Sequence, residues 1–75
     1  MNSDVQLDAK GLNCPLPILK AKKTLKGMEA GKTLEIISTD PGSVADFEAF
    51  CRTTGNELLE SSSGDGIFTY YIKKT

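Results

Sequence analysis

One cysteine stands in a stretch that favours thiol chemistry. It is Cys14, within Gly-Leu-Asn-Cys-Pro-Leu-Pro at residues 11–17. Proline suits the first turn of a helix, because its missing N–H would have no partner there. We therefore expect Pro15 to be the first helical residue, Cys14 to be the N-cap, and Pro17 to stiffen the turn. A helix N-terminus lowers the pKa of a cysteine, and the thiolate is the reactive form.

The sequence contains no histidine that would activate this thiol. A cysteine hydrolase pairs its nucleophile with a base, so the composition argues against that class. A thiol that only holds and passes on a group needs no such base. Asn13 and the free N–H groups of the first helical turn are suited to stabilise its anion. The alternative is that Cys14 is a small apolar side chain without reactivity.

The size and charge of the chain narrow the classes of function. Its 75 residues predict a single domain over residues 1–75. Nine basic and ten acidic residues give a net charge of −1, which offers no general attraction to nucleic acid. Residues 1–8 lack the features of a signal peptide, and no apolar run would span a bilayer, so we expect a cytoplasmic protein. Two cysteines without histidine make at most half of a usual structural zinc site, so no metal is expected.

The elements that position this cysteine follow from the periodicity of the sequence. Residues 5–9 alternate apolar and polar side chains and predict a strand. The helix that follows should run to about Lys26 and end at Gly27 or Gly31. Its buried face should comprise Ile18, Ala21, Leu25 and Met28. Residues 32–39 are rich in β-branched side chains and predict a second strand.

The second half of the chain predicts another helix and a hairpin. Ser43, with Asp46 three residues later, resembles a capping box that begins a helix ending at Gly55. The apolar side of this helix should comprise Val44, Phe47, Phe50, Cys51 and Thr54. Residues 56–74 predict two strands joined by a Gly-Asp-Gly turn. The last strand should direct one face to the core, made of Phe68, Tyr70 and Ile72.

The resulting order of elements is β-α-β-α-β-β. It predicts an α+β fold, a two-layer α/β sandwich in which a four-stranded mixed sheet carries two helices on one face. Strands that are parallel in a β-α-β unit end at the same edge of the sheet. Asp40, just after the second strand, is therefore expected near Cys14, where it would help to order the loop. The alternative is that Asp40 is only a turn residue before Pro41.

Two further sets of residues have a functional and a purely structural interpretation. Cys51 is a candidate resolving cysteine for a disulfide with Cys14, but its place in the middle of a helix favours the core. Four lysines on the first helix would form a docking patch for an acidic partner or a solvated face, namely Lys20, Lys22, Lys23 and Lys26. Lys20 and Lys23 are preferred for contact because they are nearer the cysteine, and Leu16 would add apolar contact.

The stretch at residues 11–17 resembles the Cys-Pro-x-Pro signature of the TusA/SirA-like sulfur-carrier family. The similarity also covers "LDAKGLNCPLP", "GKTLEI", "STDPGS", "GNELLE" and "YYIKKT", and therefore nearly the whole chain. One departure is Leu16, which stands where motifs of this family often carry Glu.

This resemblance implies a fold similar to the C-terminal domain of translation initiation factor three. It also implies a carrier that accepts sulfane sulfur on Cys14 as a persulfide and gives it to a partner protein. The donor would be a cysteine desulfurase or a rhodanese, and the acceptor another protein of a sulfur relay. Such relays serve thiolation of the tRNA wobble uridine, sulfur oxidation or molybdenum-cofactor supply. Because the carrier is both substrate and sulfurtransferase, its classification as an enzyme is partly semantic.

Two other classes of function stay open at this point. One is a regulatory module that binds protein or nucleic acid, which would keep its activity in a Cys14→Ser variant. The other is a thiol redox protein that cycles between Cys14 and Cys51, which needs the two sulfurs within bonding distance. The carrier hypothesis requires no cofactor, no direct contact with nucleic acid or membrane, and no oligomer, so we expect a monomer.

Overall fold

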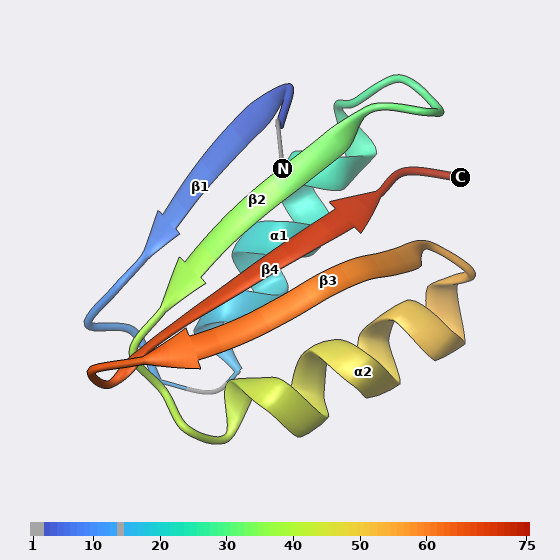
Figure 1. Ribbon diagram of the computed structural model, residues 1–75. Coiled ribbons are helices and arrows are strands. Elements are labelled where there is room, and N and C mark those ends of the chain that lie inside the picture. Colours follow the sequence, from blue (N-terminus) through green and yellow to red (C-terminus); the bar gives the residue numbers. More distant parts are fainter. Residues whose placement is uncertain (1–2, 14) are drawn as a thin grey trace.

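A computed structural model describes residues 3–13 and 15–75 of the chain. The described elements are β1 (Val5–Ala9), α1 (Leu16–Lys26), β2 (Thr33–Ser38), α2 (Ser43–Thr54), β3 (Glu57–Gly64) and β4 (Ile67–Lys73). The four strands form one sheet in the order β1-β2-β4-β3 (Figure 1). The expected β-α-β-α-β-β sandwich is therefore confirmed.

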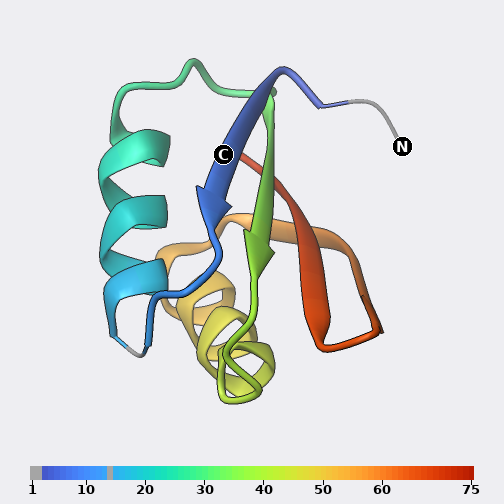
Figure 2. The same cartoon turned by 90° about the vertical axis from the view of Figure 1, so that its left-hand side faces the viewer.

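The sheet is mixed and covered on one face. Strand β1 pairs with β2 in parallel, whereas the pairs β2–β4 and β4–β3 are antiparallel. Both helices lie on the same side of the sheet (Figure 2). Alternate residues of the central strands point into the core between the layers, because side chains alternate along a strand. The core includes Ala9, Ala21, Leu25, Leu34, Ile36, Phe47, Phe50, Cys51, Tyr70 and Ile72.

The start of α1 differs from the prediction by one residue. Pro15 is the N-cap, and its carbonyl accepts the first helical hydrogen bond, from the Leu19 N–H at 3.0 Å. The Leu16 N–H donates to the Asn13 carbonyl at 2.9 Å, so a turn precedes the helix. The expected N-cap at Cys14 is thus wrong, and Cys14 itself lies outside the described residues. Proline is tolerated at both positions, which is why the motif alone did not decide between them.

The rest of α1 follows the expected pattern. Its second residue is Pro17, which is buried, and the helix ends at Gly27. Ala21 and Leu25 are buried as predicted. The two outer members of the predicted face, Ile18 and Met28, are partly buried and pack against the core.

The start of α2 corrects a second prediction. Gly42, which has no side chain, is the N-cap, and Ser43 is the first helical residue. The Ser43 hydroxyl is hydrogen-bonded to the Tyr70 hydroxyl at 2.6 Å, in a buried position. The capping box is therefore wrong, because the buried tyrosine hydroxyl competes for the same serine oxygen.

The end of α2 agrees with the sequence except at one residue. Gly55 adopts a left-handed conformation with φ of 81°, and its N–H donates to the Cys51 carbonyl. Phe47 and Phe50 are buried and Val44 packs against the core. Thr54, expected on the apolar side, is exposed, and its hydroxyl donates to the Phe50 carbonyl at 2.8 Å.

The hairpin between β3 and β4 is closed by two residues with positive φ. Gly64 pairs with Ile67, and between them Asp65 and Gly66 have φ values of 54° and 77°. Positive φ at both central positions is the geometry of a type I′ turn, which matches the twist of the paired strands. This turn holds the strand that carries Tyr70 in register.

We predict that Gly66→Ala lowers the free energy of unfolding by about 1–2 kcal/mol, because a side chain is strained at this φ. Gly64→Ala is the matched control, since Gly64 has no positive φ and a Cβ there meets no atom within 4 Å. Urea denaturation of both variants measures the difference. Equal decreases in the free energy of unfolding of the two variants would contradict the assignment of a type I′ turn.

Candidate functional site

The loops that follow β1 and β2 lie at one edge of the sheet. Ala9, the last residue of β1, is in register with Ser38, the last residue of β2. The Gly11 N–H donates to the Thr39 hydroxyl at 2.9 Å, which ties the first loop to the end of β2. The motif cysteine, Cys14, falls outside the described residues. Its described neighbours in the sequence belong to this tied loop and to the start of α1.

Asp40 builds the turn from β2 into α2. Its carboxylate accepts the Gly42 N–H at 3.1 Å, and its carbonyl accepts the Ser43 N–H at 3.0 Å. Its own N–H donates to the Ser38 hydroxyl at 3.1 Å. The turn interpretation of Asp40 is therefore confirmed. Thr39, the neighbour of Asp40, holds the Gly11 loop. The Asp40 turn therefore lies at the same end of the sheet as the loop at residues 11–13. Its predicted role in support of Cys14 stays a prediction.

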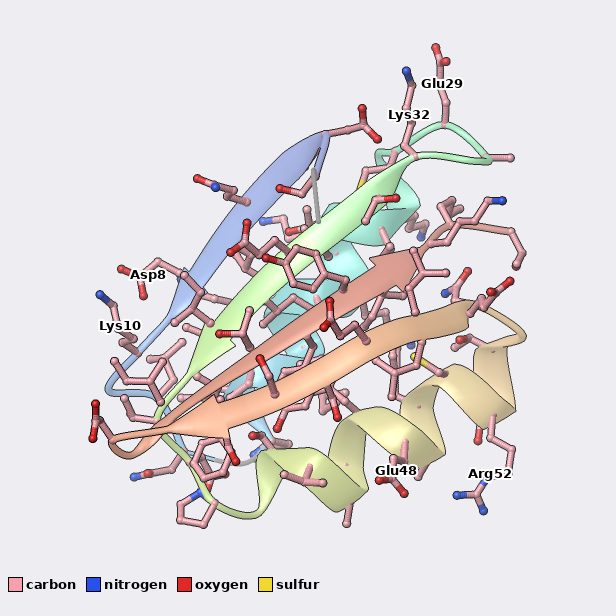
Figure 3. All side chains as sticks on the ribbon, viewed as in Figure 1. Asp8, Lys10, Glu29, Lys32, Glu48 and Arg52 are labelled. Carbon is pink, nitrogen blue, oxygen red and sulfur yellow. The ribbon has the colours of Figure 1, made fainter. Side chains whose placement is uncertain are left out.

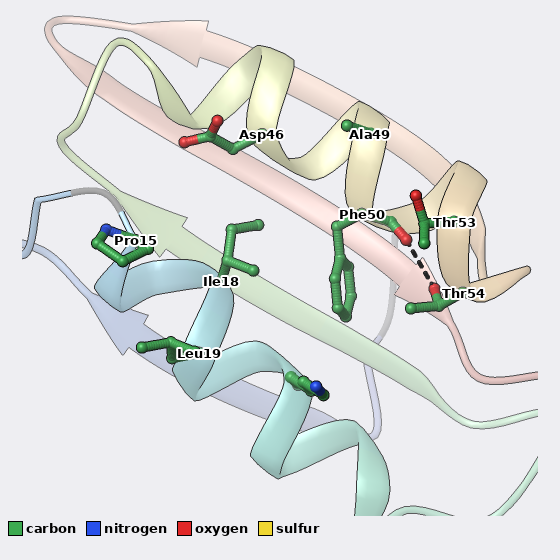
Figure 4. Close-up of a pocket in the computed structure, with 9 residues that line it drawn as sticks. Pro15, Ile18, Leu19, Asp46, Ala49, Phe50, Thr53 and Thr54 are labelled. Atoms are coloured by element: carbon green, nitrogen blue, oxygen red, sulfur yellow. Dashed lines mark hydrogen bonds between the residues drawn. The ribbon is translucent and has the colours of Figure 1, made fainter.

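An apolar groove begins at Pro15 and runs between α1 and α2. Its volume is about 450 Å³. Figure 4 shows the side chains of the two helices that face one another across it. Its lining consists of Pro15, Ile18, Leu19, Lys22, Asp46, Ala49, Phe50, Thr53 and Thr54. The groove thus opens beside the residue that follows Cys14 in the sequence.

Two exposed leucines extend the apolar surface of α1. Leu16 is 47% exposed and Leu19 is 53% exposed. The contact of Leu16 with a partner stays a prediction, and Leu19 was not among the predicted contact residues. The available signal was that Leu19 is apolar yet lies off the face formed by Ala21 and Leu25. An exposed leucine pair beside a groove is a feature of protein contact surfaces.

The lysines of α1 are all exposed, as expected of a solvated helix face. Lys22, which was not among the lysines preferred for contact, lines the apolar groove. Lys20 and Lys23 lie outside this lining. Their role in partner binding stays a prediction, and Lys22 joins them as a candidate.

Cys51 is a core residue. Its side chain is 6% exposed, its thiol is free, and burial raises its pKa to about 11. The core interpretation is therefore confirmed. At neutral pH its thiolate is scarce, which disfavours its use as a resolving cysteine.

Two other findings concern metals and membranes. Among the described residues, no group of His, Cys, Asp and Glu side chains is arranged to hold a metal ion. Within residues 3–13 and 15–75, neither helix is long and apolar enough to cross a membrane.

Comparisons with known proteins agree with this fold and motif. The family model "Sulfurtransferase TusA" matches residues 5–74. The sulfur carrier protein TusA of Allochromatium vinosum is 61% identical over 72 residues, covering 96% of this chain and 95% of that protein. A putative sulfur carrier protein of Neisseria meningitidis serogroup A is 53% identical over 73 residues, with 97% of each chain covered. The chain belongs to the TusA family of sulfur carrier proteins.

A solved structure supports the architecture independently. The crystal structure of a SirA-like protein from Desulfitobacterium hafniense superposes with a TM-score of 0.80 at 27% identity. The match covers 92% of this chain and 95% of that chain. The two-layer fold described above is therefore shared with that protein.

We predict that Cys51 resists alkylation in the native protein. With a pKa of about 11, roughly one Cys51 thiol in a thousand is ionised at pH 8. In a Cys14→Ser variant, iodoacetamide at pH 8 should react at least about 100-fold more slowly than in denaturant. The control is the Cys51→Ala variant, which reports on Cys14 alone. Equal rates with and without denaturant in the first variant would show that Cys51 is accessible and reactive.

Proposed function

We propose that this protein holds sulfane sulfur as a persulfide on Cys14 and transfers it to a partner protein in a sulfur relay. The observation that carries the proposal is the motif itself, Cys-Pro-Leu-Pro at residues 14–17, in a chain of the TusA family. The described geometry is consistent with it. The loop at residues 11–13 is tied to β2, α1 begins directly after the motif's first proline, and an apolar groove starts there.

The chemistry is a pair of displacements at sulfur that need no external oxidant. The Cys14 thiolate attacks the outer sulfur of a donor persulfide, and the donor's sulfur–sulfur bond breaks. The donor cysteine leaves as a thiolate, and Cys14 now carries the outer sulfur. In the second step an acceptor cysteine thiolate attacks that outer sulfur, and Cys14 leaves as a thiolate. Thiolates are good leaving groups, so the reaction proceeds without a histidine.

Four residues around the motif are assigned supporting roles. Asn13 closes the turn before α1 through its carbonyl, and its side chain is suited to donate to a sulfur anion. Pro15 and Pro17 restrict the backbone on the C-terminal side of the cysteine. Asp40 orders the neighbouring turn through its bond to Gly42.

The proposed docking surface surrounds the motif. Leu16 supplies exposed apolar contact, and Lys20 and Lys23 attract an acidic partner. The donor is a cysteine desulfurase or a rhodanese, and the acceptor is another relay protein. The carrier acts as a monomer in the cytoplasm, without metal, cofactor or direct contact with nucleic acid or membrane. Its relay serves tRNA wobble-uridine thiolation or sulfur oxidation.

We expect the protein to gain one sulfur atom when it is incubated with a cysteine desulfurase and cysteine. Intact mass spectrometry without reductant measures the gain. The Cys51→Ser variant should also gain the atom, because its remaining thiol is the proposed carrier. The Cys14→Ser variant should not. No gain in wild type with desulfurase or rhodanese donors would favour the binding-module alternative, and a loss of two hydrogens would favour the redox alternative.

We also expect the double variant Lys20→Glu/Lys23→Glu to raise the KM for the acidic partner roughly fivefold at low salt, with little change in kcat. The effect should shrink as the ionic strength rises, because exposed charges are screened. Lys32→Glu is the control. Lys32 lies in the loop before β2, away from the sheet edge marked by Lys10 (Figure 3). If Lys32→Glu raises the KM equally, the effect is one of net charge and the assigned docking surface is wrong.

A further inference from the structure

A buried pair of hydroxyl groups joins the sheet to the start of α2. The Ser43 and Tyr70 oxygens are 2.6 Å apart, and each residue is 1% exposed. The Tyr70 ring also packs on Phe47, with ring centroids 4.7 Å apart. The motif, the groove and the docking surface include neither member of this pair.

The hydrogen bond between Ser43 and Tyr70 is directional, and the Tyr70 hydroxyl keeps its proton. Burial raises the pKa of Tyr70, and the nearby carboxylates of Asp40, Asp46 and Glu48 act in the same direction, whereas the bond to Ser43 lowers it. The tyrosine therefore remains a neutral hydroxyl at physiological pH. An apolar contact would tolerate sliding of α2 along the sheet, whereas a short buried hydrogen bond specifies one position.

A continuous chain of contacts leads from this pair to the motif loop. The Ser43 N–H donates to the Asp40 carbonyl, and the Asp40 carboxylate accepts the Gly42 N–H. Next to Asp40, the Thr39 hydroxyl accepts the Gly11 N–H at 2.9 Å. The position of Ser43 therefore sets the position of residues 39–42, and within them Thr39 holds the loop at residues 11–13 through Gly11.

We infer that Ser43 and Tyr70 are positioning residues for the chemistry of Cys14. Their hydrogen bond fixes the turn at residues 39–42 against the sheet, and through that turn it fixes the loop before the cysteine. The inference rests on the proposed function for the reaction that is affected. The chain of contacts itself stands independently of that function.

The test compares variants with and without the hydroxyl groups. Tyr70→Phe removes one partner. Ser43→Thr and Ser43→Val add similar bulk, but only the threonine keeps the hydroxyl. The first measurement is the rate of sulfur uptake from a desulfurase. The second is the pH profile of iodoacetamide alkylation in a Cys51→Ala background, which reports on the Cys14 thiol alone.

Tyr70→Phe and Ser43→Val should each slow sulfur uptake roughly tenfold, because small displacements of reacting groups are costly. Each should also shift the midpoint of the alkylation profile, a change that a loss of global stability would not produce in a folded protein. Ser43→Thr should retain the wild-type rate and profile. The double variant Ser43→Val/Tyr70→Phe should be no slower than either single variant, because both remove the same bond.

Ile72→Val is the control for lost packing. Ile72 is buried on the same strand as Tyr70 and is no part of the contact chain. It should leave both readouts unchanged, with folding of every variant checked by circular dichroism at the assay temperature. If Ser43→Val does not fold, Ser43→Ala is measured in its place, because it removes the hydroxyl without adding bulk.

Wild-type rates and profiles in Tyr70→Phe and Ser43→Val would overturn the inference, as would an equal change in Ile72→Val. If the wild-type protein takes up no sulfur, the proposed function fails. In that case the alkylation profile still decides whether the hydroxyl pair positions the thiol.

Discussion

The parallel pairing of β1 with β2 is the constraint on which the rest of the structure depends. Parallel neighbours require a crossover, and here α1 supplies it across one face of the sheet. The pairing brings the loops after both strands to the same edge, where the Gly11 N–H binds the Thr39 hydroxyl. The loop at residues 11–13 is thereby tied to the residue after β2, and α1 begins close by at Leu16. Without this pairing, the turn at Asp40 and the motif loop would have no common anchor.

The exposed sequence neighbours of Cys14 contrast with the burial of Cys51. Cys51 belongs to the buried face of α2, where desolvation opposes ionisation and keeps the thiol inert. Cys14 lies outside the described residues, but its neighbours in the sequence, Asn13 and Pro15, are both exposed. A sulfur carrier needs one reactive thiol and gains from the inertness of any other.

The layer arrangement also explains the groove. Both helices cover the same face of a narrow sheet, and the seam between them opens to solvent beside Pro15. Leu19, which lines this seam, stays exposed, and so does Leu16 at the start of α1. The apolar surface thus lies next to Pro15, the residue that follows Cys14 in the sequence.

Local patterns determined much of this protein. The alternation at residues 5–9, the type I′ turn at Asp65 and Gly66, and the helix ends at Gly27 and Gly55 follow from short-range rules of backbone geometry. The order of these elements was sufficient to predict the sandwich. The Cys-Pro-x-Pro motif was sufficient to predict the family.

Tertiary structure decided what depends on distant residues. Ser43 does not cap α2, because its hydroxyl is bound to Tyr70, 27 positions away. Leu19 became part of a surface only when α1 and α2 packed side by side. Such features depend on which side chains from distant parts of the chain meet in the core. A local sequence pattern carries no information on those contacts.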